Sequence, residues 1–173
     1  LAKVEAGKWE MEESEADLRA LCESTLQMVR ERARSAEVSL SLAPGPPAVA
    51  IRADRRLLHQ ILLNLLTNGI KFTDRGGRAT RGWALAEDGG AVLAVTDTGV
   101  GMSDEDRRKV LEPFGRGSAE LARARHDTGL GLSLCKQFAE MHGGRMAIES
   151  ALGRGTTVTV ILPRERVIVR PAE

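Results

Sequence analysis

Between Gln60 and Phe72 apolar residues occupy nearly every position, as is typical of a helix buried on most of its surface. Gln60, Asn64, Asn68 and Lys71 interrupt the pattern at spacings of four, four and three, which stack side chains along one helix face. Amides and an ammonium are costly inside a core unless polar groups meet them. The segment predicts a core helix with one polar stripe, which either faces solvent or binds a ligand such as a magnesium-bound polyphosphate.

Periodicity along the rest of the chain predicts further helices and strands. The predicted helices span residues 17–35, 55–73 with Asp54 as its cap, a short stretch capped by Ser103, and residues 130–142. The predicted strands span residues 8–11, 38–42, 49–51, 79–86, 91–96, 145–150 and 156–162. Because these strands follow one another mostly as antiparallel neighbours with the helices gathered to one side, we expect a two-layer α/β sandwich with a mixed, mostly antiparallel sheet.

The chain of 173 residues is long enough for one large domain, and its hydrophobic fraction of 42% is ample for a core. We expect residues 1–16 to be a linker, residues 17–163 to be the domain and residues 164–173 to be a C-terminal tail. Two Trp, three Phe and no Tyr predict an aliphatic core. Because the chain begins with Leu1 rather than methionine, we expect it to be a fragment of a longer protein.

Charge and cysteine usage exclude several classes of function. A formal charge of +1, with no basic patch interleaved with aromatic residues, argues against nucleic-acid binding. No apolar run approaches the roughly 20 residues needed to span a bilayer, and no signal peptide is present. Cys22 and Cys135 lack metal-ligand spacing, so we expect two buried thiols in a reducing compartment.

The segment Thr96–Met102 follows a strand of alternating apolar residues and places Asp97 at the strand end. The Asp97 carboxylate could accept a hydrogen bond from an exocyclic amine such as that of adenine. Gly99 and Gly101 would let a flat ring approach closely. A plain turn is the alternative, while a calcium loop would need more oxygen ligands at alternating positions.

A second glycine-rich segment, Thr128-Gly129-Leu130-Gly131-Leu132, opens the helix predicted over residues 130–142. Free backbone amides and the dipole at a helix start favour phosphate. The spacing fits neither the Walker loop nor the dinucleotide fingerprint, so an ordinary glycine-rich helix start is the alternative. Residues 153–157, which include Thr156, predict a tight hairpin between the last two strands, and a turn without a function is the alternative there.

These four segments resemble, in order, the N, G1, G2 and G3 boxes of the catalytic ATP-binding domain of sensor histidine kinases. Residues 112–116, Glu-Pro-Phe-Gly-Arg, resemble the family's F box, and residues 4–12 resemble the junction that follows its phosphoacceptor helices. The resemblance covers about residues 50–163. It implies the Bergerat ATP-binding fold of the superfamily that also contains DNA gyrase, the heat-shock chaperone ATPases and the mismatch-repair ATPases.

The resemblance implies ATP and Mg²⁺ as cofactors, with Asn68 as the metal ligand and with Lys71 and Arg116 acting on the phosphates. The other implied nucleotide contacts are Asn64, Phe72, Asp97, Gly99, Gly101, Met102, Thr128, Gly129, Leu130, Gly131, Leu132 and Thr156. It also implies a cytoplasmic, two-component signalling role for a parent protein that is a homodimer, whether or not that parent is anchored in a membrane.

The expected reaction is transfer of the γ-phosphoryl group to a histidine, for relay to a response regulator. Hydrolysing relatives generally carry a glutamate as general base at the position of Asn64, and an amide cannot take that proton. His59, His126 and His142 lack the sequence context of the family's acceptor, so we expect the acceptor on an upstream dimerisation domain, to which residues 1–16 would be the linker.

Two departures from the family keep a second hypothesis open. Gly69 stands where the family usually has alanine, and His126-Asp127 stand where glycines commonly precede Thr128. A pseudokinase, in which the fold binds nucleotide as an allosteric module, is therefore the alternative to an active kinase. A gyrase- or chaperone-type ATPase is the third hypothesis, and Asn64 and the missing transducer domain disfavour it.

Overall fold

The computed structural model describes residues 10–43, 45–46, 49–112 and 131–169. Its main sheet has five strands in the order β2-β4-β5-β7-β6. These strands are β2 (Ser39–Leu42), β4 (Arg78–Leu85), β5 (Ala91–Asp97), β7 (Thr156–Leu162) and β6 (Arg145–Ser150). β2 and β4 pair in parallel and the other neighbours are antiparallel, so the predicted mixed, mostly antiparallel sheet is confirmed.

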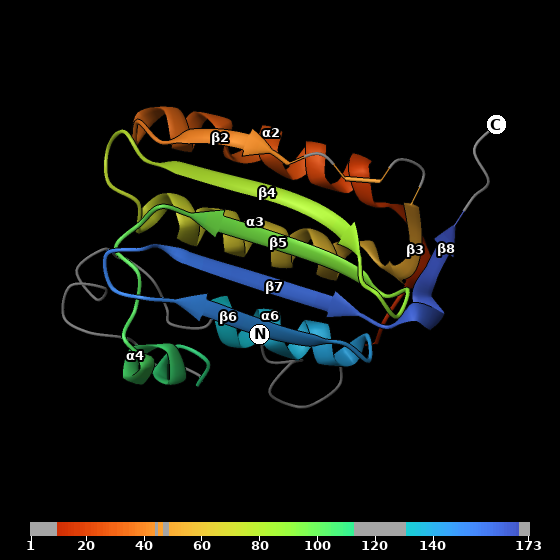
Figure 1. The fold of residues 1–173 in the computed structure, drawn as a ribbon. Helices are drawn as coiled ribbons and strands as arrows, with labels where there is room; N and C mark the ends of the chain where they lie inside the picture. Colours follow the sequence, from red (N-terminus) through yellow and green to blue (C-terminus); the bar gives the residue numbers. More distant parts are fainter. Residues whose placement is uncertain (1–9, 44, 47–48, 113–130, 170–173) are drawn as a thin grey trace.

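Three helices cover one face of this sheet: α2 (Leu18–Ser35), α3 (Arg55–Lys71) and α6 (Gly131–Met141) (Figure 1). The short helix α4 (Asp104–Lys109) lies at one end of the sheet beside β6 (Figure 1). The two-layer α/β sandwich expected from the sequence is therefore confirmed. Within the described part of the chain, no helix is long and apolar enough to cross a membrane.

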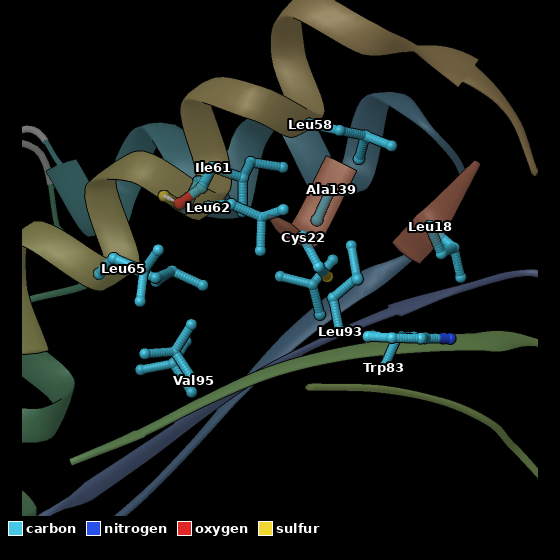
Figure 2. Packing of buried hydrophobic residues seen from close by; sticks show 14 of the residues in the cluster. Leu18, Cys22, Leu58, Ile61, Leu62, Leu65, Trp83, Leu93, Val95 and Ala139 are labelled. Carbon is cyan, nitrogen blue, oxygen red and sulfur yellow. Dashed lines mark hydrogen bonds between the residues drawn. The ribbon is translucent and has the colours of Figure 1, made fainter. Parts of the chain in front are cut away.

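The core forms where α3 packs on the sheet. Leu62 and Leu65 of α3 point toward the sheet, where Leu93 and Val95 of β5 lie, and Leu58 and Ile61 belong to the same buried cluster (Figure 2). All six side chains are at most 2% exposed. Burying one such side chain stabilises the fold by about 1.5–3 kcal/mol. This apolar contact fixes how α3 is rotated, and it leaves the polar stripe of the helix away from the sheet.

A second sheet of three strands lies at one end of the main sheet, in the order β1-β3-β8 (Figure 1). These strands are β1 (Glu13–Asp17), β3 (Val49–Asp54) and β8 (Val167–Val169), and both outer strands are antiparallel to β3. The prediction of a strand around Lys8–Met11 is wrong for residues 10 and 11, because β1 begins only at Glu13. Residues 1–9 lie outside the described residues.

The predicted helix caps are confirmed. Asp54 accepts hydrogen bonds from the backbone N–H groups of Arg56 and Leu57, and Ser103 Oγ accepts one from Asp106 N at 3.1 Å. Burial alone raises the pKa of Asp54, but hydrogen bonds from the Arg56 side chain and from backbone amides outweigh it and hold the pKa below its ordinary value. The start of α3 is therefore anchored by a carboxylate that stays ionised.

His142, at the end of α6, ties this region together because it is fully buried. Its Nε2 accepts a hydrogen bond from Asp54 N at 3.1 Å, so its Nδ1 carries the proton and donates to Phe138 O at 2.7 Å. Arg166 donates to His142 O and to Glu13, which joins α6 to β1. Burial lowers the pKa of His142, so the folded state holds the neutral ring.

We expect the free energy of unfolding to fall as the pH drops below about 6.5, the ordinary pKa of histidine. The unfolded chain takes up a proton there, while His142 in the fold is flanked by Arg166 and by the Asp54 N–H and resists protonation. Denaturant titrations of wild type and His142→Gln from pH 7.5 to 5 would measure the difference in stability, with His59→Gln as the matched control. A constant difference across this range would contradict the assigned role.

Candidate functional site

Several sequence segments that were predicted to carry function meet at one end of the sandwich, opposite β3 and β8 (Figure 1). β5 ends there at Asp97, which pairs in register with Thr156, the first residue of β7. β6 ends there at Ser150, and the C-terminus of α3 lies behind. Val100 N donates to Phe72 O at 3.1 Å, which fastens the loop after β5 to the end of α3.

Glycines let the backbones at this end approach more closely than any side chain would allow. An added Cβ would lie 2.3 Å from Phe72 O at Gly99, 1.9 Å from Ala151 O at Gly101 and 2.0 Å from Asp97 O at Gly155. Gly101 and Gly155 also have positive φ angles of 71° and 80°. The glycines predicted to shape a binding surface thus also lock the loop after β5 between α3 and the β6–β7 turn.

Ser150 is a functional candidate that the sequence analysis missed. Its Oγ accepts a hydrogen bond from Met102 N at 2.8 Å, donates to Gly155 O at 3.0 Å and lies 2.8 Å from Thr156 Oγ1. One hydroxyl therefore holds the loop and the hairpin together, with Met102 only 7% exposed beneath them. Ser150 is the last residue of an ordinary strand, so no motif marked it.

Asp97 is the electrostatic centre of the site. Its Oδ1 accepts a hydrogen bond from Gly99 N at 2.8 Å, and the backbone amide of Thr156 also bonds to the carboxylate. Burial raises the pKa of Asp97 to about 6, and these two hydrogen bonds only partly oppose the rise. A carboxylate that is half-buried yet ionised at neutral pH is a strong acceptor for a donor such as an exocyclic amine.

The polar stripe of α3 is half-buried at Asn64, Asn68 and Lys71, with Gln60 exposed at its far end. Gln60 Nε2 donates to Asn64 Oδ1 at 2.8 Å, and the Asn64 side chain partly opposes the rise that burial causes in the pKa of the Cys135 thiol on α6. The stripe is therefore neither sealed in the core nor fully turned to solvent. Asn68 follows one turn later, and the next residue, Gly69, faces Asp97.

The start of α6 adjoins this stripe. A Cβ added to Gly131 would lie 3.7 Å from Asn68 Nδ2, so the first residue of α6 is a close neighbour of the predicted metal ligand. Leu132 is half-buried against the core. Arg116, Thr128, Gly129 and Leu130, together with the loop predicted over residues 115–128, lie outside the described residues. Cys22 and Cys135 are buried free thiols, as predicted.

An amide oxygen is a hard ligand, and half-burial leaves Asn68 open to a ligand on one side. Among the residues described, no three His, Cys, Asp or Glu side chains gather as a metal site. The chemistry of this site thus fits a magnesium ion that arrives with a polyphosphate and keeps most of its oxygen ligands from phosphate and water, rather than a cage built by the protein.

Comparison with known proteins identifies the family. Residues 53–166 match the family of histidine kinase-, DNA gyrase B- and HSP90-like ATPases. The match spans most of the chain, and the chain belongs to this family. The resemblance inferred from the four boxes is therefore confirmed, as is the family's fold.

Within that family, the similar proteins are histidine kinases. The chain is 43% identical over 163 residues to the histidine protein kinase DivJ of Caulobacter vibrioides, and 37% identical over 176 residues to the circadian input-output histidine kinase CikA of Synechococcus elongatus. These matches cover 94% and 100% of this chain but only 27% and 23% of the two relatives. The structure of full-length ShkA in complex with AMPPNP matches with a TM-score of 0.84 and 25% identity, over 99% of this chain and 34% of that one.

We expect Asp97→Asn to stabilise the protein by about 1 kcal/mol above pH 7, because burial penalises the ionised carboxylate. The wild-type carboxyl has a folded pKa above its unfolded value, so its contribution to stability is lost as the pH rises through about 6. The advantage of the variant should therefore shrink below pH 6, in denaturant titrations at pH 8 and 5.

Asp88→Asn is the matched control for this prediction. Asp88 is exposed, and its Oδ1 also accepts a hydrogen bond from the backbone two residues later, Gly90 N, at 2.8 Å. The control should show no gain in stability that depends on pH in this way. Equal behaviour of the two variants would contradict the role of burial at Asp97.

Proposed function

We propose that this chain binds Mg-ATP and donates the γ-phosphoryl group to a histidine outside the chain, on an upstream dimerisation domain, for relay to a response regulator. The observation that carries the proposal is that a half-buried carboxylate, Asp97, lies next to the polar stripe of α3 at Gly69. Asp97 is placed to accept a hydrogen bond from the base of a nucleotide. The polar stripe of α3, at the same end of the sandwich, is placed to meet its phosphates.

The adenine end is supported by Asp97, Thr156 and Met102. The carboxylate would accept the exocyclic amine, Thr156 pairs with Asp97 in the sheet, and Met102 would offer an apolar contact to the ring. Ser150 holds both of these neighbours in position. The complex of ShkA with AMPPNP, an ATP analogue, supports adenine nucleotide as the ligand class.

The phosphate end is supported by Asn68, Lys71 and the start of α6. Asn68 would hold magnesium, which when bound neutralises phosphate charge and orients the γ-phosphoryl group. Lys71 would neutralise phosphate oxygens, and we propose Arg116 as a further contact. The helix dipole and the backbone N–H groups at the start of α6 favour the anionic chain of phosphates. These groups position and neutralise, which is the main protein contribution to phosphoryl transfer.

Asn64 favours transfer to an imidazole over hydrolysis by water. Its amide cannot act as a general base, and its Oδ1 already accepts a hydrogen bond from Gln60 Nε2. A water molecule beside it would therefore lack a general base at this position. An imidazole nitrogen attacks with its own lone pair, forms the P–N bond as the bond to ADP breaks, and needs no such base.

Asn68→Ala should weaken nucleotide binding about tenfold or more in the presence of Mg²⁺ and far less without it, because the substitution removes the proposed metal ligand. Calorimetric titration of the chain with an ATP analogue, with Mg²⁺ and with EDTA, separates the two conditions. Thr67→Ala, the preceding position on α3, controls for altered helix stability. Equal losses with and without metal would place the metal elsewhere.

The chain alone should not label itself with phosphate from ATP, since we expect the acceptor histidine elsewhere. When the upstream helical region of its parent protein is supplied as a separate polypeptide, the histidine there should acquire an acid-labile phosphate. Transfer is measured with ATP labelled at the γ-phosphate, and replacement of the acceptor histidine is the control. Tight nucleotide binding without any transfer would instead support the pseudokinase, and rapid phosphate release would support the ATPase.

A further inference from the structure

The backbone conformation at Gly69, in the middle of the site, does not require a glycine. It lies inside α3, and it is not among the glycines with a positive φ. Its carbonyl accepts a hydrogen bond from Thr73 Oγ1 at 2.6 Å, so the helix turn around it is intact. Glycine weakens a helix interior relative to alanine, which makes its presence there costly unless the absent side chain serves a purpose.

The space that a side chain would fill at Gly69 is open and lies beside Asp97. An added Cβ would lie 3.7 Å from Asp97 Oδ2, 3.7 Å from Asp97 Cβ and 3.8 Å from Val95 Cγ1, which are ordinary van der Waals contacts. Among the described neighbours, nothing comes closer. This distinguishes Gly69 from Gly99, Gly101 and Gly155, where an added Cβ would collide with backbone.

The missing side chain at Gly69 lies within reach of an amine that donates to Asp97. An N–H donor lies about 2.9 Å from its acceptor oxygen, and a methyl carbon bonded to that nitrogen is then roughly 3.8 Å from the oxygen. The alanine methyl that Gly69 lacks would lie at 3.7 Å from Asp97 Oδ2. Both methyl groups would contact the same carboxylate, so an alanine at residue 69 would narrow the space beside the bound amine.

We propose that this site accepts adenine nucleotides that carry a small alkyl group on the exocyclic amine, and that Gly69 sets this tolerance. The inference rests on the proposed function, because it assumes that the adenine amine donates to Asp97. One amine hydrogen remains for the carboxylate after methylation, so the hydrogen bond is kept. The side chains of Val95 and Asp97, each in ordinary van der Waals contact with a methyl group placed at residue 69, line this space.

The test compares ADP with N6-methyl-ADP on wild type and on Gly69→Ala by calorimetry. Wild type should bind the two nucleotides within about threefold of each other. Gly69→Ala should keep its affinity for ADP and lose about tenfold or more for N6-methyl-ADP, the discrimination that one methyl group can give in a binding site.

Two controls keep the outcomes separate. Thermal unfolding of Gly69→Ala should show a melting temperature at least equal to that of wild type, and His59→Ala, on the same helix but far from Asp97, should leave the preference between the nucleotides unchanged. If ADP binds but both proteins treat N6-methyl-ADP alike, the inference is overturned while the proposed function stands. If ADP itself does not bind wild type, the proposed function fails and the inference falls with it.

Discussion

The packing of the apolar face of α3 against β5 is the contact on which the site depends. Leucine and isoleucine side chains on that face exclude water completely, so the rotation of the helix about its axis has one stable value. That rotation turns Asn64, Asn68 and Lys71 away from the core and brings Gly69 opposite Asp97. If α3 were rotated by half a turn about its axis, two amides and an ammonium group would face the apolar sheet. Burying these polar groups there would strongly destabilise the fold.

The other end of the sandwich holds α3 in its axial position. Asp54 caps its first turn, and the buried ring of His142 joins that cap to the end of α6. Arg166 then joins α6 to Glu13 on β1 and to the backbone of Arg52 on β3. These hydrogen bonds join β1, β3, the start of α3 and the end of α6 in one polar network. A displacement of β1 would therefore also displace the start of α3.

Two charged side chains, Asp97 and Arg81, are partly or fully removed from solvent, and the structure accounts for only the first. Asp97 is held ionised beside two backbone donors and is placed where a ligand can complete its hydrogen bonding. Arg81 on β4 is fully buried, with one nitrogen donating to Thr25 and with Nε and Nη2 unpaired among the described residues. The desolvation cost at Asp97 is offset when a donor binds to its carboxylate. Nothing in the described structure explains the unpaired nitrogens of Arg81.

The sequence alone determined the layers of the fold and the helix caps, and it singled out most of the residues that we propose for the site, because periodicity and glycine spacing are local properties of the chain. It misplaced β1, gave no sign of β8, and placed no weight on Ser150. Those features depend on partners far away in sequence: β3 for both outer strands, and the loop after β5 together with the β6–β7 turn for Ser150. Only the tertiary structure decided that Gly69 faces Asp97, since no local pattern reports which atoms lie opposite a helix once it has packed.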